Sequence, residues 1–249
     1  MDDNQLLRYS RQILLPQIDL SGQRKLLDAT VFIVGLGGLG SPAAMYLAAA
    51  GVGHLLVNDF DRVDLSNLQR QILHATDDIG TAKTRSAMAT LHRLNPEVRI
   101  TPIGERLDEA GLEIAMNQAN VVLDCSDNLA TRFAVNRACF RQGKPLVSGA
   151  AIRFEGQLAV FWPGVGDSAC YNCLYPHDEG GVETCSQNGV AAPVPGIIGS
   201  LQALEAIKLL TLPAYAPFNV LHLFDGLGFE WQRMRVTRNP DCATCGRNG

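Results

Sequence analysis

The chain has 249 residues and a mass of 26.9 kDa, and 47% of its residues are hydrophobic and 18% charged. This is the composition of an ordinary globular protein, which excludes a disordered linker protein and a collagen. The formal net charge of −4 excludes a histone-like protein that holds nucleic acid through an overall basic field.

The N-terminal segment, MDDNQLLRYSRQ, starts with two acidic residues and has no apolar core, so it is not a secretory signal. Apolar residues at helical spacing predict a helix over 4–15, and we expect residues 1–28 to form a helical arm. The seven cysteines, an odd number, argue against a secreted disulfide framework. We therefore expect a soluble cytoplasmic protein without a membrane partner.

Residues 29–150, the expected nucleotide-binding half, alternate short β-branched runs with helical stretches. The runs predict strands at 29–34, 54–59, 97–103, 121–124 and 146–148, and the helical stretches lie at 42–50, 83–94, 109–118 and 129–142. Alternation of this kind predicts an α/β fold with a doubly wound, Rossmann-like, mostly parallel sheet.

The regular alternation of predicted strands and helices ends in residues 151–249. A strand at 157–162 is followed by a stretch rich in Gly, Pro and Cys that ends near 195. A helix at 197–210 and strands at 219–225 and 229–237 complete the chain. We expect a single domain over 1–249 whose last hundred residues form an irregular C-terminal lobe.

A glycine-rich loop, Gly35-Leu-Gly-Gly-Leu-Gly40, matches G-x-G-x-x-G and lies between a predicted strand and a predicted helix. In this context the glycines permit a tight turn and a close approach of backbone N–H groups to a phosphate. Asp59, at the end of the second strand, is the acid expected to bind a ribose hydroxyl. A plain structural turn is the alternative, and the loop alone does not distinguish a dinucleotide from ATP.

Charged and amide side chains follow the predicted strand ends: Asn67, Arg70, Lys83 and Asp127. In an open parallel sheet, ligands bind outside the carboxyl ends of the strands. Cations suit a triphosphate, and a carboxylate suits Mg²⁺. The alternatives are solvated surface charges for Arg70 and Lys83 and a helix N-cap for Asp127.

Two C-x₂-C pairs lie in the C-terminal half: Cys170 with Cys173, and Cys242 with Cys245. Four thiolates can hold Zn²⁺ as a structural ion in a closed tetrahedral site. The 68 residues between the pairs mean that such an ion would tie the chain end to its middle. Redox pairs and free thiols are the alternatives.

Taken together, GLGGLG, Asp59, SNLQRQ at 66–71, Lys83 and DCSDN at 124–128 resemble the ATP-dependent activating enzymes of ubiquitin-like proteins, specifically their bacterial MoeB/ThiF branch. The resemblance runs from RYSRQI to the final CATC. It implies an adenylyltransferase that adenylates the C-terminal Gly-Gly carboxylate of a small ubiquitin-fold sulfur carrier for molybdopterin or thiamine biosynthesis. VSGAAIRFEGQ favours the MoeB side of the branch, whereas LLDATV and LFDG favour ThiF.

The same resemblance implies roles for individual residues. Asp127 would bind Mg²⁺, and the two C-x₂-C pairs would bind Zn²⁺. Arg11 would contribute to the site of a second subunit, which implies a homodimer. Cys185 would lie on a loop that crosses over the nucleotide. In some relatives the thiol at this position forms a covalent link to the carrier. An exposed helix arginine and an ordinary loop cysteine are the alternatives for these two. The residues expected at the nucleotide are Gly38, Asp59, Ser66, Asn67, Leu68, Gln69, Arg70, Lys83, Asp127 and Asn128.

Three other functions are weighed against this one. A related enzyme that activates a tRNA-linked carboxylate should have a basic groove, which the net charge of −4 does not favour. An NAD-dependent oxidoreductase would leave Arg70, Lys83 and Asp127 without a role. A non-catalytic scaffold that binds a carrier need not retain Lys83 and Asp127.

Overall fold

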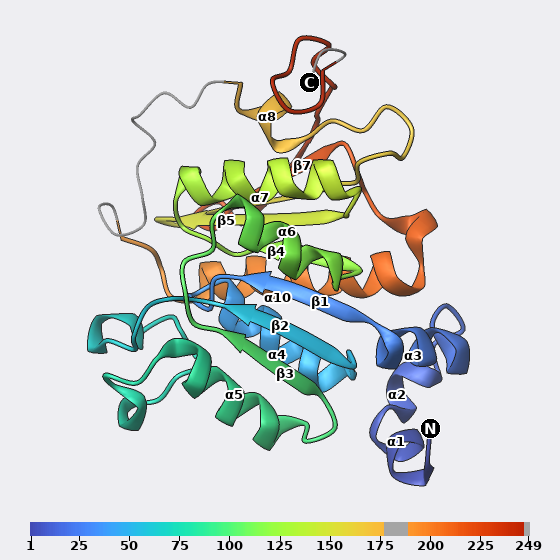
Figure 1. The fold of residues 1–249 in the computed structure, drawn as a ribbon, viewed down its shortest axis with the longest axis vertical. Helices are drawn as coiled ribbons and strands as arrows, with labels where there is room; N and C mark the ends of the chain where they lie inside the picture. The colour runs from blue at the N-terminus through green and yellow to red at the C-terminus, as the bar shows by residue number, and fades with distance from the viewer. Residues whose placement is uncertain (177–188, 247–249) are drawn as a thin grey trace.

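The computed structural model describes residues 1–176 and 189–246. An eight-stranded sheet in the order β3-β2-β1-β4-β5-β6-β7-β8 runs through the molecule, with helices on both faces (Figure 1). The predicted α/β class with a mostly parallel, doubly wound sheet is confirmed.

The parallel half of the sheet is formed by the first five strands. β2 and β4 are buried at every residue, which explains why their sequences are continuous apolar runs rather than alternating ones. These strands are β1 (Thr30–Val34), β2 (His54–Asn58), β3 (Arg99–Ile103), β4 (Val121–Asp124) and β5 (Leu146–Ile152).

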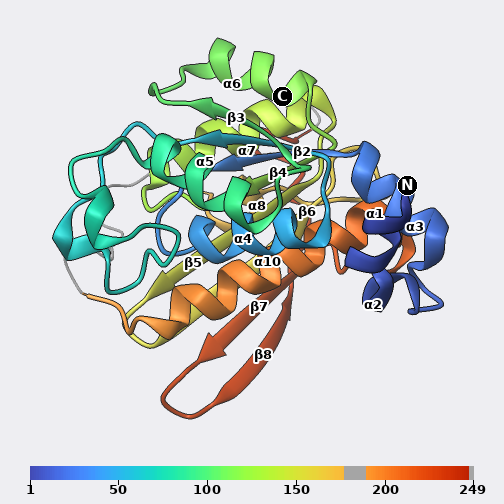
Figure 2. The same cartoon turned by 90° about the horizontal axis from the view of Figure 1, so that it is seen from below.

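Three antiparallel strands extend the same sheet: β6 (Glu155–Phe161), β7 (Val220–Asp225) and β8 (Glu230–Arg235). β8 is exposed at every residue, and the β7–β8 hairpin projects from the body of the molecule (Figure 2). The segment expected as an irregular lobe thus contributes regular strands to the sheet of the nucleotide-binding half.

Two hydrophobic cores lie on opposite faces of the sheet, because successive side chains of a strand point to opposite faces. Val31 and Ile33 of β1 point into one core, and Phe32 and Val34 point into the other. The first core is covered by α4 (Gly40–Ala50), α5 (Lys83–Leu94) and α10 (Pro193–Thr211), and the second by α6 (Glu109–Asn117), α7 (Leu129–Gln142) and the short α8 (Tyr171–Leu174). Short 3-10 turns lie at η1 (Leu65–Asn67), η2 (Thr76–Asp78) and η3 (Pro213–Tyr215).

The N-terminal arm differs from the single helix predicted over 4–15. It consists of α1 (Asp3–Arg8), α2 (Ser10–Ile13) and α3 (Asp19–Asp28), with a break at Tyr9. Tyr9 is buried, and its hydroxyl accepts a hydrogen bond from Asn95 Nδ2 at 2.9 Å. The break lets this side chain turn inward while the flanking arginines stay outside. The arm lies at the amino ends of the strands, since α3 leads directly into β1.

The long helix α10 begins at Pro193, four residues before its predicted start. A proline is compatible with the first turn of a helix, because its missing N–H has no intrahelical partner there. By length and composition α10 could span a membrane, but 56% of its apolar window is buried inside the protein. It packs against α4, β5 and β6, so here it is a core helix.

Candidate functional site

A cavity of about 310 Å³ opens at the carboxyl ends of β1, β2 and β4. β1 and β4 are neighbours in the sheet, and the winding of the chain reverses between them. Such a reversal leaves a crevice outside the strand ends, where open α/β sheets bind ligands. The cavity wall includes Gly38, Asp59, Arg70, Lys83 and Asp127, so the structure brings together groups from five separate segments.

The glycine loop forms one wall of this cavity. Gly35 has a φ of +93°, and a Cβ there would lie 2.8 Å from the carbonyl oxygen of Cys125. A Cβ on Gly40 would collide with the Gly35 carbonyl oxygen, because α4 starts directly against the turn. These contacts explain the first and third glycines by backbone packing. Gly38, between them, lines the cavity.

Asp59 and His74 hold the loop from two sides at Leu36. The Leu36 N–H donates to Asp59 Oδ2 at 2.8 Å, and the Leu36 carbonyl oxygen lies 3.2 Å from His74 Nε2. A carbonyl only accepts, so Nε2 carries the proton; Nδ1 lies 2.8 Å from Ser86 Oγ. Burial lowers the pKa of His74, which favours the neutral ring. His74 was given no role from the sequence, where nothing links it to a loop 38 residues away.

Lys83 places a buried ammonium at the cavity. It is the first residue of α5 and only 5% exposed. Its Nζ lies 3.0 Å from Asp61 Oδ2 and 3.7 Å from Asp59 Oδ2. A buried cation requires such partners, since an unpaired charge out of water is strongly unfavourable. The two carboxylates therefore hold the Lys83 ammonium in place next to the glycine loop.

The segment SNLQRQ contributes to the cavity wall through its last two residues, Arg70 and Gln71. Arg70 Nη1 donates to the Ser66 carbonyl oxygen at 3.1 Å. Gln71 Oε1 is buried without a hydrogen-bond partner in the described part of the chain. The residues predicted around the phosphates and ribose just before them, Ser66, Asn67, Leu68 and Gln69, form the turn at and after η1 and do not line the cavity.

The loop after β4 carries Asp127. Its carboxylate is exposed at the cavity and has no polar partner among residues 1–176 and 189–246. Asn128 is the N-cap of α7, with its side chain accepting from Thr131 N at 2.9 Å, so the cap role considered for Asp127 belongs to its neighbour. An exposed carboxylate at the mouth of the cavity is chemically suited to Mg²⁺, which prefers oxygen ligands and retains waters.

Behind this loop lies a buried ion pair that the sequence did not indicate. Asp124, 1% exposed, accepts from Ser126 N at 3.0 Å and from Ser126 Oγ at 2.6 Å. Arg132, 8% exposed, donates from Nη2 to the Ser126 carbonyl oxygen at 2.6 Å, and its Nη1 lies 4.0 Å from Asp124 Oδ2. Although burial opposes its charge, the pKa of Arg132 is raised by Asp124 and Tyr171.

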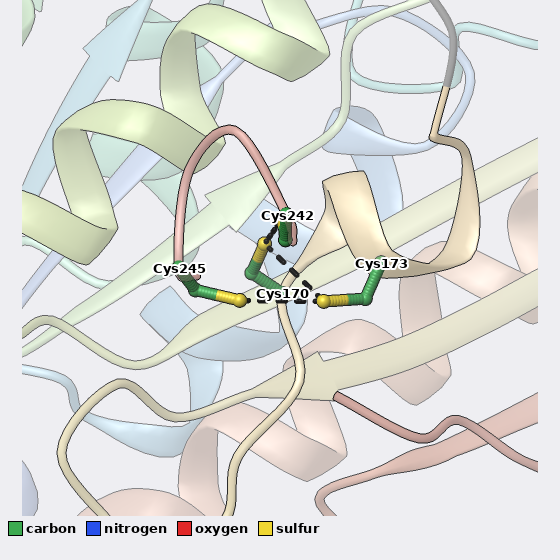
Figure 3. A group of neighbouring side chains, drawn as sticks. All are labelled: Cys170, Cys173, Cys242 and Cys245. Atoms are coloured by element: carbon green, nitrogen blue, oxygen red, sulfur yellow. Dashed lines mark hydrogen bonds between the residues drawn. The ribbon is translucent and has the colours of Figure 1, made fainter. Parts of the chain in front are cut away.

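The four cysteines of the two C-x₂-C pairs form one group, the cysteine cluster (Figure 3). It includes Cys173 of α8 and lies at the far end of the molecule from the N-terminal arm (Figure 1). Their Sγ atoms lie within 4.8 Å of one another, with 3.3 Å between Cys173 and Cys245 and 3.6 Å between Cys170 and Cys242. Tetrahedral zinc with Zn–S bonds of about 2.3 Å requires sulfurs roughly 3.8 Å apart, and disulfides require about 2.05 Å. The cluster is compatible with zinc.

Hydrogen bonds to the sulfurs also fit a metal–thiolate site. The backbone N–H of Asn239 donates to Cys173 Sγ at 3.3 Å, and that of Thr244 donates to Cys242 Sγ at 3.5 Å. Hydrogen bonds from the Cys170 thiol and from the Asn239 N–H lower the pKa of Cys173, which favours the thiolate. The other two described cysteines, Cys125 and Cys139, are buried, and burial raises the pKa of each thiol.

Besides Ser66, Asn67, Leu68 and Gln69, one further predicted site residue lies outside this cavity. Arg11 is exposed on α2, in a second hollow formed with Tyr46 and Leu204, at the opposite end of the strands. Cys185 lies outside the described residues.

The sequence matches the model of the ThiF family over residues 9–244. It is 48% identical over 246 residues to the sulfur carrier protein ThiS adenylyltransferase of Escherichia coli K12, with 99% of this chain and 97% of that protein covered. The molybdopterin-synthase adenylyltransferase of the same strain is 47% identical over 247 residues, with 99% of each chain covered. A crystal structure of E. coli MccB with MccA-N7isoASN has a TM-score of 0.85 at 25% identity and covers 96% of this chain and 75% of that one.

Proposed function

This chain belongs to the ThiF family and is an adenylyltransferase, and we propose that it adenylates the C-terminal Gly-Gly carboxylate of a small ubiquitin-like sulfur carrier with ATP. The observation that carries the proposal is the cavity at the β1–β4 reversal, where a glycine loop, the buried Lys83, Arg70 and the unpartnered Asp127 meet. Identities of 48% and 47% to two adenylyltransferases leave both a thiamine-type and a molybdopterin-type carrier as substrates to be tested.

In the proposed reaction, an oxygen of the carrier carboxylate attacks the α-phosphorus of ATP. The bond from that phosphorus to the bridging oxygen breaks, which gives the acyl-adenylate and pyrophosphate. The nucleophile is already ionised, so no general base is required. Because two anions must approach each other, catalysis consists of positioning and of neutralising charge on the phosphates.

The cations of this chain supply that neutralisation. We assign Lys83 and Arg70 to the phosphates, Gly38 to the phosphates and ribose, and Asp59 to a ribose hydroxyl. Asn67 and the rest of Ser66–Gln69 do not line the cavity, so they would reach the phosphates and ribose from the turn beside Arg70. Asp59 already accepts from Leu36 N and Asp61 N, so its carboxylate is oriented before any ligand arrives. Asp127, with Asn128 beside it, would hold Mg²⁺, which supplies further positive charge to the phosphates when bound.

The cysteine cluster would hold Zn²⁺ as a structural ion. All four positions of a tetrahedral site are filled by cysteines, so no position is left for a substrate. We therefore assign it stabilisation of the fold and no step of the reaction.

Arg11 is assigned to the cavity of a second subunit, which implies a homodimer. It lies at the amino ends of the strands, whereas the cavity of its own chain lies at the carboxyl ends. The surface around it carries exposed apolar side chains, including Leu14, Tyr46 and Leu204, as expected of a surface that becomes covered. Cytoplasmic location remains part of the proposal.

Cys185 is assigned as the thiol that can accept the activated carrier. The first step, formation of the acyl-adenylate, does not use it. The variant Cys185→Ser should therefore retain adenylation, and loss of that step would contradict this assignment.

The test is pyrophosphate–ATP exchange with the purified protein, adding a thiamine-type carrier, a molybdopterin-type carrier, and each without its last glycine. We expect exchange with one intact carrier and none with its truncated form, and Asp127→Ala should abolish it. ATP binding without exchange would instead favour a non-catalytic scaffold or an enzyme for a tRNA-linked carboxylate.

A further inference from the structure

We propose that Arg132 is a positioning residue that fixes the direction of the Asp127 carboxylate, and that its helix, α7, connects the Asp127 loop to the cysteine cluster. The proposal rests on the proposed function for one point, that Asp127 holds the divalent cation. No motif in the sequence indicated Arg132, which is the fourth residue of α7.

The first step of the argument is the peptide that precedes Asp127. Arg132 Nη2 donates to the Ser126 carbonyl oxygen at 2.6 Å, and this oxygen belongs to the peptide unit that joins Ser126 to Asp127. A fixed peptide plane constrains the direction in which the Asp127 side chain leaves the backbone. On the other side, Asn128 is held by its cap to Thr131 N. The backbone of Asp127 is thus fixed on both sides, while its carboxylate stays unpartnered among the described residues.

The second step is the geometry of the guanidinium. Its Nη1 faces Asp124, which in turn holds Ser126 through its N–H and its hydroxyl. Arg132 therefore contacts the same residue directly and through Asp124. A lysine would retain the charge but offers a single ammonium in place of a planar fork, so it cannot reproduce both contacts.

The third step is the connection to the cysteine cluster. Tyr171 lies between Cys170 and Cys173 and is 6% exposed. The ring of Tyr171 packs edge-on against Phe133 at 5.4 Å, and its backbone N–H donates to Asn136 Oδ1 at 2.8 Å. Helix α7 therefore contacts the Asp127 loop near its start and the cluster along the next turns. A supporting residue of this kind typically changes metal affinity by about 10–100-fold when altered.

The experiment compares Arg132→Lys with Arg137→Lys, an exposed arginine of the same helix that pairs with Glu109. Mn²⁺ binding is measured by electron paramagnetic resonance with a saturating non-hydrolysable ATP analogue, and zinc content is measured on the same samples. We expect Arg132→Lys to retain zinc and to bind Mn²⁺ about tenfold more weakly. In pyrophosphate–ATP exchange, Arg132→Lys should change the KM for ATP only slightly. It should raise more strongly the Mg²⁺ concentration that gives the half-maximal rate. Arg137→Lys should behave like the unaltered protein.

The variant Asp127→Ala distinguishes failure of this proposal from failure of the proposed function. If Asp127→Ala loses Mn²⁺ binding and Arg132→Lys does not, the positioning role is overturned alone. If neither loses it, the metal role of Asp127 fails, and the positioning role fails with it. Asn136→Ala removes the acceptor of the Tyr171 N–H on α7, and we expect weaker Mn²⁺ binding with zinc retained; unchanged binding would overturn the connection to the cluster.

Discussion

The cavity and the cysteine cluster are built in opposite ways from equally recognisable motifs. At the cluster the four sulfurs approach one another within 4.8 Å, and Cys245 is fully buried. At the cavity the chain pairs Lys83 with two carboxylates but leaves Asp127 exposed and without a partner among the described residues. A closed set of ligands serves stability, whereas an open one is available to a ligand that enters and leaves. Changes at the cavity should therefore alter rate, and changes at the cluster should alter stability.

The largest effect is expected from Lys83→Met, which tests the cavity side of this comparison. Loss of the buried cation should reduce pyrophosphate–ATP exchange by about 10²–10³-fold, the usual effect of removing one group that stabilises charge in a transition state. Lys208→Met is the matched control, because Lys208 is also paired with a carboxylate, Glu205, at 2.8 Å but lies on α10 outside the cavity wall. Near-normal exchange in Lys83→Met would remove this lysine from the phosphates.

The cluster side is tested by Cys242→Ser. We expect loss of bound zinc and a fall in melting temperature of about 10 °C. In a chain of this size, each kcal/mol lost from the free energy of unfolding lowers the melting temperature by roughly 2–4 °C. Cys139→Ala, at a buried thiol outside the cluster, should retain zinc. Zinc is measured by atomic emission and melting by circular dichroism. A variant that loses zinc and keeps its melting temperature would show that the cluster does not stabilise the fold.

The smallest effect is expected from mild acid and concerns two buried histidines, His54 at the start of β2 and His74 beside the glycine loop. Burial lowers the pKa of His54 and of His74 in the folded chain, so the unfolded chain binds more protons between the unfolded and folded pKa values. Stability should thus be complete above about pH 6.5 and fall as the pH drops below it, by at most about 1.4 kcal/mol per histidine for each pH unit.

Urea unfolding at pH 7.5 and 5.5 measures this pH dependence. His74→Gln should reduce it, and His92→Gln, an exposed residue on α5, should leave it unchanged. An equal pH dependence in His74→Gln and the unaltered protein would contradict a neutral His74 beneath the glycine loop.

Local signals account for most of what the sequence predicted about the fold. The helix predicted over 129–142 is matched by α7, which starts after the Asn128 cap and ends at Gly143, whose φ is +63°. The break at Tyr9 could not be predicted in the same way, because its cause is a hydrogen bond to Asn95, 86 residues away.

The residues of the candidate site also fall into two groups, those with a local sequence signal and those that depend on long-range contacts. Gly38, Lys83 and Asp127 belong to motifs or follow strand ends, so the sequence indicated them. His74, Arg132 and Gln202 act by contacts that only the fold creates; Gln202 of α10 donates to the Asp124 carbonyl oxygen at 2.8 Å across 78 residues. Hydrophobic periodicity reports burial and says nothing of the partner of a buried polar group, and for this reason the supporting residues were missed.

The central position of β1 in the sheet also governs the order in which the chain can fold. β1 and β2 are joined by a single helix, whereas the pairing of β1 with β4 must close a segment of about 90 residues, as in the bond from Thr30 N to Asn120. Closing a longer segment costs more chain entropy and slows folding. The crevice lies at this late junction, so a partly folded chain with β1, β2 and β3 in place has no binding cavity. Nucleotide binding therefore reports on completed folding of the whole sheet.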